Sequence, residues 1–168
     1  MKSTLEILLR LRAEGTIPQF AIGGAVAASF YVEAVATEDL DIFAFLQVAP
    51  SGLLVLTPLY ARLIEFGGVV KNEHVVLHGW PVQILPAYTP LVEEALSAAI
   101  EQHFHDVMVP VITADYLCAI ALQTGRAKDY QRVNALLEAS VVDVVMLKKL
   151  VHQYQLEDRW EQYVRRYS

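Results

Sequence analysis

A pair of glycines followed by a pair of aspartates constrains the fold of this chain more than any other feature of its sequence. Gly23 and Gly24 end a short apolar run, and the small apolar residues after them predict a helix. Asp39 and Asp41 then lead into the run "LDIFAFLQ", which is apolar, aromatic and of strand length. The sequence therefore predicts a strand, a glycine turn, a helix, and a second strand that begins with two carboxylates.

The Asp-x-Asp spacing gives the second strand a specific chemistry. Side chains two residues apart on a strand point to the same face, so Asp39 and Asp41 are expected side by side. Adjacent carboxylates repel unless a cation lies between them, and Mg²⁺ takes one or two carboxylates together with phosphate oxygens. The glycines precede a helix N-terminus, whose free N–H groups can hold a phosphate. Together these features are typical of a phosphoryl-transfer site.

Each feature also has a simpler interpretation when it is taken alone. A Gly-Gly between a strand and a helix is typical of a tight turn, because glycine adopts backbone conformations that other residues avoid. An Asp-x-Asp at the start of a strand is typical of a solvated strand end or a cap. The order and spacing of the two motifs favour the phosphate-and-metal interpretation.

Two Thr-Pro dipeptides, at 57–58 and 89–90, each predict the first turn of a helix. Threonine caps a helix through its hydroxyl, and proline is favoured at the first helical position because its missing N–H is not needed there. After 113 the chain reads as helical to its end, with apolar residues at helical spacing. We therefore expect a mixed α/β (α+β) core over 1–112 and a helical C-terminal part over 113–168 packed on it.

Several short apolar segments predict the remaining strands. A hairpin is expected to turn at 71–73, with His74 at the start of its second strand and exposed or half-buried. A further strand is predicted over 81–85. The segment 104–112 predicts a strand or an extended link, and its Pro110 argues against a central position in the sheet.

Composition limits the possible partners and location of the protein. The 168 residues are 55% hydrophobic and 19% charged, which is typical of a folded domain rather than a disordered chain. A net charge of −6 argues against broad affinity for nucleic-acid backbone. The single cysteine, Cys118, allows no internal disulfide and fits a cytoplasmic setting. No apolar run approaches the ~20 residues of a membrane helix, so we expect no membrane association.

Three segments together resemble the DNA polymerase β-like nucleotidyltransferase superfamily. The first, "IGGAVAASFYVEAVATEDLDIF", matches its signature of Gly-Gly, a helix, and Asp-x-Asp on the next strand. The second, "PVQILPAYTPLVEEAL", is similar to the strand and helix that follow in small bacterial members. The third, "TADYLCAIALQTGRAKDYQRVNALLE", resembles their C-terminal Gly-Arg-x-Lys-Asp motif. The likeness covers most of 18–140 and is to the branch that includes bacterial abortive-infection and toxin–antitoxin nucleotidyltransferases.

The resemblance implies a fold and a set of roles. The fold would be a nucleotidyltransferase-type small mixed sheet flanked by helices and followed by a helical part. The two aspartates would be catalytic and would hold two Mg²⁺ ions, and Lys128 would lie near the triphosphate of a bound NTP. Asp129 would position neighbouring groups. The nucleotide-binding set implied is Gly23, Gly24, Thr37, Arg126, Lys128 and Asp129.

Three departures from the family pattern remove charge from this site. Gln83 occupies the position of the third catalytic carboxylate, and its amide oxygen can bind a cation but is a poor base. Val35 stands where small bacterial relatives place a basic residue, and Ala121 where they carry a lysine. Losing one carboxylate of a metal site reduces turnover by orders of magnitude.

Three functions therefore stay open. The chain is an active nucleotidyltransferase that moves a nucleotidyl group from an NTP to a hydroxyl of RNA, a protein or a small molecule. Alternatively, it is a catalytically degenerate relative that binds nucleotide as a regulatory module. A third possibility is an interaction protein of the toxin–antitoxin kind, whose apolar surface docks a second copy or a partner protein.

Overall fold

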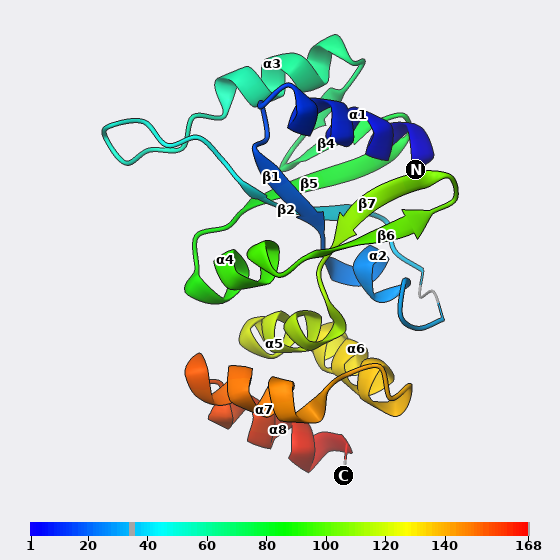
Figure 1. Ribbon diagram of the computed structural model, residues 1–168, viewed down its shortest axis with the longest axis vertical. Coiled ribbons are helices and arrows are strands. Elements are labelled where there is room, and N and C mark those ends of the chain that lie inside the picture. Colours follow the sequence, from blue (N-terminus) through cyan, green and yellow to red (C-terminus); the bar gives the residue numbers. More distant parts are fainter. Residues whose placement is uncertain (34–35, 168) are drawn as a thin grey trace.

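A mixed β-sheet with helices on both faces organises the first part of the chain (Figure 1). The computed structural model describes residues 1–33 and 36–167. Within these residues the strand order is β3-β4-β5-β2-β1-β7-β6. The strands are β1 Gln19–Ile22, β2 Leu40–Phe45, β3 Val69–Lys71, β4 His74–Leu77, β5 Trp80–Pro86, β6 Ile100–Phe104 and β7 Val107–Val111. The helices are α1 Lys2–Ala13, α2 Gly24–Ala28, α3 Thr57–Glu65, α4 Pro90–Ser97, α5 Ala114–Thr124, α6 Ala127–Glu138, α7 Val144–Gln153 and α8 Glu157–Tyr167.

β2 lies in the middle of the sheet, antiparallel to β1 and parallel to β5. Burial alternates along it, because successive side chains of a strand point to opposite faces. Leu40 and Ile42 are fully buried, whereas Asp41 and Phe43 are only partly buried. In Figure 1, α1 and α3 lie on one side of the sheet, and α2, α4 and the C-terminal helices lie on the other. Asp41 touches the start of α2 at Gly24, so the carboxylates lie on the side of the C-terminal helices.

The expected mixed α/β fold with a helical C-terminal part is confirmed, but three elements differ from the sequence-based expectation. α2 is shorter than the run of small residues suggests. It ends near Ser29, whose hydroxyl donates to the carbonyl of Val26 at 2.6 Å, before an aromatic and β-branched stretch that disfavours helix. The strand β6 is not predicted by the sequence. β7 lies between β1 and β6 despite Pro110, and its pairing with β1 is at Ile22–Val111, beyond the proline that lacks an N–H donor.

α5 connects the sheet layer to the helices that follow it. It packs against α2 and α4 and also against α6, α7 and α8. Apart from Tyr116, its buried side chains are small or apolar, including Leu117, Cys118, Ala121 and Leu122. No helix in the described ranges is both long enough and apolar enough to cross a membrane.

Glu94 on α4 joins this layer to the C-terminal helices through hydrogen bonds. Its carboxylate accepts a hydrogen bond from the Tyr116 hydroxyl of α5 at 2.6 Å and from the Gln153 amide of α7 at 2.8 Å. The Tyr154 hydroxyl donates to the same carboxylate. The bonds from Tyr116, Tyr154 and Gln153 lower the pKa of Glu94. Burial, and then the bond to Glu94, raise the pKa of Tyr154 to about 12.

Glu94→Gln is expected to lower the free energy of unfolding by roughly 1–3 kcal/mol, because the hydrogen bonds lose their charged acceptor. The carboxylate stabilises the fold above its ordinary pKa of 4.5, and this contribution is lost as the pH falls through the lowered folded value. Tyr154 contributes below its ordinary pKa of 10.0 and stops contributing as the pH rises through about 12. Urea unfolding of wild type and variant at acid and neutral pH measures the difference. The exposed neighbour Glu93→Gln is the control, and an acid-independent difference for Glu94→Gln would contradict the assignment.

Candidate functional site

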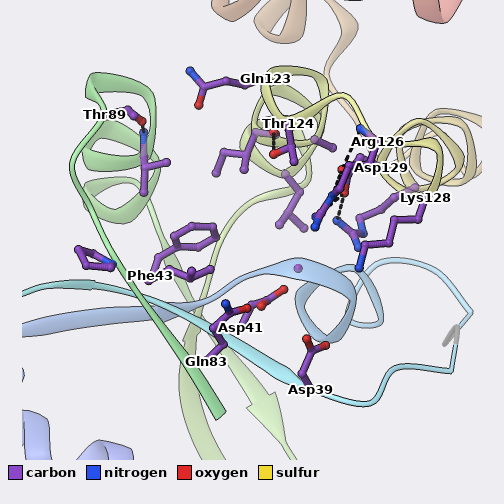
Figure 2. Close-up of a pocket in the computed structure, with 18 of the residues that line it drawn as sticks. Asp39, Asp41, Phe43, Gln83, Thr89, Gln123, Thr124, Arg126, Lys128 and Asp129 are labelled. Carbon is purple, nitrogen blue, oxygen red and sulfur yellow. Dashed lines mark hydrogen bonds and ion pairs between the residues drawn. The ribbon is translucent and has the colours of Figure 1, made fainter. Parts of the chain in front are cut away.

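Two neighbouring cavities, of about 300 and about 460 Å³, open on the carboxylate side of β2. The first lies against α4 and α5, and the second lies between α2 and α6. Figure 2 shows Asp39 and Asp41 on the sheet side and Arg126 and Lys128 opposite them on the helical side. The charged residues that line both cavities are Asp39, Asp41, Arg126, Lys128 and Arg132.

The two glycines are required because β2 passes close to the start of α2. The N–H of Gly23 donates to the carbonyl of Asp41 at 2.9 Å, and a Cβ on Gly23 would lie 2.3 Å from the ring of Phe43. Gly24 has a φ of +58°, and a Cβ on it would lie 1.9 Å from Oδ2 of Asp41. A side chain at position 24 therefore cannot coexist with this placement of the carboxylate. α2 is only 5 residues long, so the phosphate cradle at its N-terminus stays a prediction.

Asp39 and Asp41 both face the shared space of the two cavities. Burial, and then the charge of Asp39, raise the pKa of Asp41, and the basic side chains across the cavity act in the opposite direction. Thr37 donates its hydroxyl to Oδ1 of Asp39 at 3.1 Å. On the other side, Nε2 of His74 lies 3.8 Å from Oδ2 of Asp39. Thr37 therefore contacts an aspartate rather than reaching the basic side of the cavities.

Gln83 lies beside Asp41 on the neighbouring strand. The parallel pairing of β2 and β5 sets Asp41 directly opposite Gln83, and both line the first cavity. Ala121 of α5 lines the same cavity. Two of the three positions where the sequence departs from the family pattern are thus brought to one site, and the third, Val35, lies outside the described residues.

Asp129 organises the basic side of the site. It is 1% exposed and accepts hydrogen bonds from Nε of Arg126 at 2.7 Å and from Nη1 of Arg132 at 3.4 Å. It also accepts from the backbone N–H of Arg126 at 3.2 Å, which caps the start of α6. Lys128 lines both cavities and pairs with none of the described acidic side chains. Asp129 therefore orients two guanidinium groups and leaves the lysine available.

Sequence reasoning missed two residues at this site. Arg132 follows Asp129 by three positions on α6, a spacing that places both on one helix face and could have been noticed. His74 comes from β4 and meets Asp39 only because of the sheet order, which no local pattern reveals.

The acidic side offers oxygen donors but no complete metal cluster. In the described part of the chain, no three side chains of the types His, Cys, Asp and Glu are grouped so as to hold a metal ion. The donors present beside each other are the carboxylates of Asp39 and Asp41 and the amide oxygen of Gln83. Hard oxygen donors of this kind suit Mg²⁺ when other ligands complete its shell.

The sheet, its carboxylate face and the helices packed on that face give this chain the fold of nucleotidyltransferase-like proteins. An antigenic nucleotidyltransferase-like protein from Paracoccidioides brasiliensis has a TM-score of 0.60 and 12% identity, over 98% of this chain and 91% of that one. The solution structure of the antibiotic-resistance factor ANT(2'')-Ia has a TM-score of 0.55 and 12% identity, over 99% of each chain.

The crystal structure of ANT(2'')-Ia in complex with adenylyl-2''-tobramycin has a TM-score of 0.54 and 12% identity, over 99% of this chain and 98% of that one. No protein-family model matches the sequence, and no curated protein matches it either. The solved structures show that this chain shares their fold, and both the superfamily and its abortive-infection branch stay predictions.

Proposed function

We propose that this protein binds a nucleoside triphosphate together with Mg²⁺ at Asp39 and Asp41, where its two cavities meet. The observation that carries this proposal is the opposition of charges across the shared space. A carboxylate pair lies on the strand side, and the basic side chains of Arg126, Lys128 and Arg132 come from the start and first turns of α6. A magnesium–triphosphate complex has matching charges, because its cation can face the carboxylates while its phosphates face the basic side chains.

The residues on the strand side fit Mg²⁺ by their chemistry. Burial and the charge of Asp39 raise the pKa of Asp41, so this carboxylate pair lacks full compensation for its charge. Two carboxylates with one amide oxygen match the ligand set that Mg²⁺ takes when phosphates and water supply the rest. The ion, when bound, would neutralise charge on the phosphate oxygens. Asp39 and Asp41 would hold it, and Gln83 would lie next to them.

The residues on the helix side suit the triphosphate. Asp129 fixes the guanidinium of Arg126 by two hydrogen bonds to its side chain, at 2.7 and 3.2 Å, so little further ordering is needed when a phosphate binds. Lys128 adds a flexible point charge beside it. These side chains act by orientation and charge, and none of them removes a proton.

Nucleotidyl transfer to a small-molecule hydroxyl is the second candidate function. The first cavity, of about 300 Å³, continues from Gln83 along uncharged residues of α4 and α5 and has room for a small acceptor. ANT(2'')-Ia, which shares the fold, has been crystallised with an adenylylated small molecule. Gln83 cannot take the proton of an attacking hydroxyl. We therefore expect the wild-type protein to bind nucleotide but to transfer the nucleotidyl group slowly.

Calorimetry with each of the common NTPs, with and without Mg²⁺, tests the binding proposal. We expect magnesium-dependent binding by wild type and a loss of about 100-fold or more in Asp41→Asn, because a metal ligand is removed. Asp158→Asn, an exposed aspartate of α8, is the matched control. Absence of binding of every NTP in both conditions would overturn the proposal. Pyrophosphate release in the presence of hydroxyl acceptors would favour the transfer function.

A further inference from the structure

We propose that His74 is a positioning residue that holds the carboxylate of Asp39 in place for metal binding. The inference rests on the proposed function, because it concerns one of the two carboxylates assigned to Mg²⁺. Nε2 of His74 lies 3.8 Å from Oδ2 of Asp39, and the hydroxyl of Thr37 donates to Oδ1 at 3.1 Å. Oδ1 of Asp39 thus has a neighbour two residues earlier in the chain, and Oδ2 has a neighbour from the distant strand β4.

The sheet brings His74 to the carboxylate face by its register. β4 is antiparallel to β5 with Val75 opposite Val82, and β5 is parallel to β2 with Gln83 opposite Asp41. Continuing the β4–β5 register by one residue places His74 beside Gln83. Along β4, Val75 is buried whereas His74 is only partly buried, as expected when successive side chains alternate between faces. His74 therefore shares a face with Gln83 and Asp41.

Asp39 needs such support more than Asp41 does. The backbone of Gly24 packs directly against the carboxylate of Asp41, which leaves that group little freedom to turn. Asp39 precedes β2, outside the strand, and its side chain is 36% exposed. A carboxylate in that position loses rotational freedom when it binds a cation, and neighbours that fix it beforehand reduce the loss.

Gln83 increases the importance of this arrangement. Gln83 is an amide where the family pattern has a carboxylate, so Asp39 and Asp41 supply the negative charge offered to a cation. The third carboxylate that lines the first cavity, Asp129, is already paired with Arg126 and Arg132. Misplacing either carboxylate would then remove half of that charge. The side chain of His74 is 25% exposed, so its own position is restricted, and it is able to restrict Asp39 in turn.

Titration with Mn²⁺ alone, followed by the electron paramagnetic resonance signal of the free ion, tests the proposal on the full chain. His74→Ala is expected to weaken Mn²⁺ binding by about 10-fold, the lower end of the range for groups that orient a metal ligand. His74→Gln keeps a polar side chain beside Asp39 and is expected to restore part of the affinity. His103→Ala, an exposed histidine on β6, is the matched control and should change nothing.

Combining His74→Ala with Asp39→Asn separates a positioning role from a direct one. If His74 acts through Asp39, its removal should change the affinity less than about twofold once Asp39 is already altered. An equal loss in both backgrounds, or no loss in the single variant, would overturn the proposal. If wild type binds no Mn²⁺, the inference about His74 is overturned, whereas the proposed function is still decided by calorimetry with an NTP and Mg²⁺. If wild type binds Mn²⁺ and Asp41→Asn does not, while His74→Ala binds normally, only the role of His74 is refuted.

Discussion

Gly24→Ala is expected to weaken magnesium-dependent nucleotide binding by about 100-fold or more, because a shift of about 1 Å in a positioned group has effects of that size. The new Cβ would lie 1.9 Å from Oδ2 of Asp41, far inside van der Waals contact, so the carboxylate has to move. Calorimetry with Mg²⁺ and an NTP measures the loss.

Gly24→Ala also strains the backbone, and a second variant separates the effect of this strain from the effect of the collision with Asp41. Gly24 has a φ of +58°, where alanine costs about 1–2 kcal/mol. Gly15 has a φ of +76° and no atom within 4 Å of its would-be Cβ. Gly15→Ala therefore carries a similar strain without a collision. We expect Gly24→Ala to lose at least as much stability as Gly15→Ala in thermal unfolding, because it adds a collision to the strain, whereas only Gly24→Ala loses binding. Equal binding by both variants would contradict a steric role for Gly24.

This glycine also shows what the sequence alone could reveal. Gly23, Gly24, Asp39 and Asp41 lie within one short segment, so strand periodicity and the glycine turn are enough to place them close together. The structure adds the reason for the second glycine, which is contact with a side chain 17 positions later (41 − 24). Local rules place the motif, and the tertiary contact explains why no other residue fits at position 24.

Features that depend on the order of strands in the sheet could not be predicted from the sequence. His74 reaches Asp39 because β4, β5 and β2 are neighbours, and no periodicity in the chain encodes that order. The prediction that Pro110 would not lie in an interior strand was wrong, because the sequence does not reveal how β7 pairs with its neighbours. The cost of a missing N–H depends on which residues of β1 and β7 actually pair, and here the pairing is at Ile22–Val111.

The position of Gln83 could be predicted only in part. Its place next to Asp41 was implied by resemblance to a family rather than by any local pattern, and the register of β2 and β5 sets the two residues opposite each other. The spacing of three residues between Asp129 and Arg132 is visible in the sequence, but such a spacing on a helix is also typical of a solvated surface pair. Strand register is thus not visible in the sequence, whereas helical spacing is visible but does not by itself identify a site residue.

Gln83→Asp is expected to raise nucleotidyl transfer by about 100-fold or more, the effect of supplying a general base at a reacting hydroxyl. The new carboxylate would lie directly opposite Asp41, on the same face and within the first cavity. Without a metal ion, a third negative charge beside Asp39 and Asp41 should destabilise the fold, because like charges on neighbouring strands repel. With Mg²⁺ the destabilisation should disappear, since the cation then lies among the three carboxylates.

Two measurements on the same variant make this prediction specific. Thermal unfolding with and without Mg²⁺ should show a larger metal-dependent rise in Tm for Gln83→Asp than for wild type, and pyrophosphate release should rise in parallel. Gln123→Asp adds the same charge to the same cavity from α5 rather than from β5, so it controls for charge alone. If Gln123→Asp responds equally, the register with Asp41 has no special role. If Gln83→Asp gains metal stabilisation but no transfer, the site holds a cation and the chain functions as a nucleotide-binding protein.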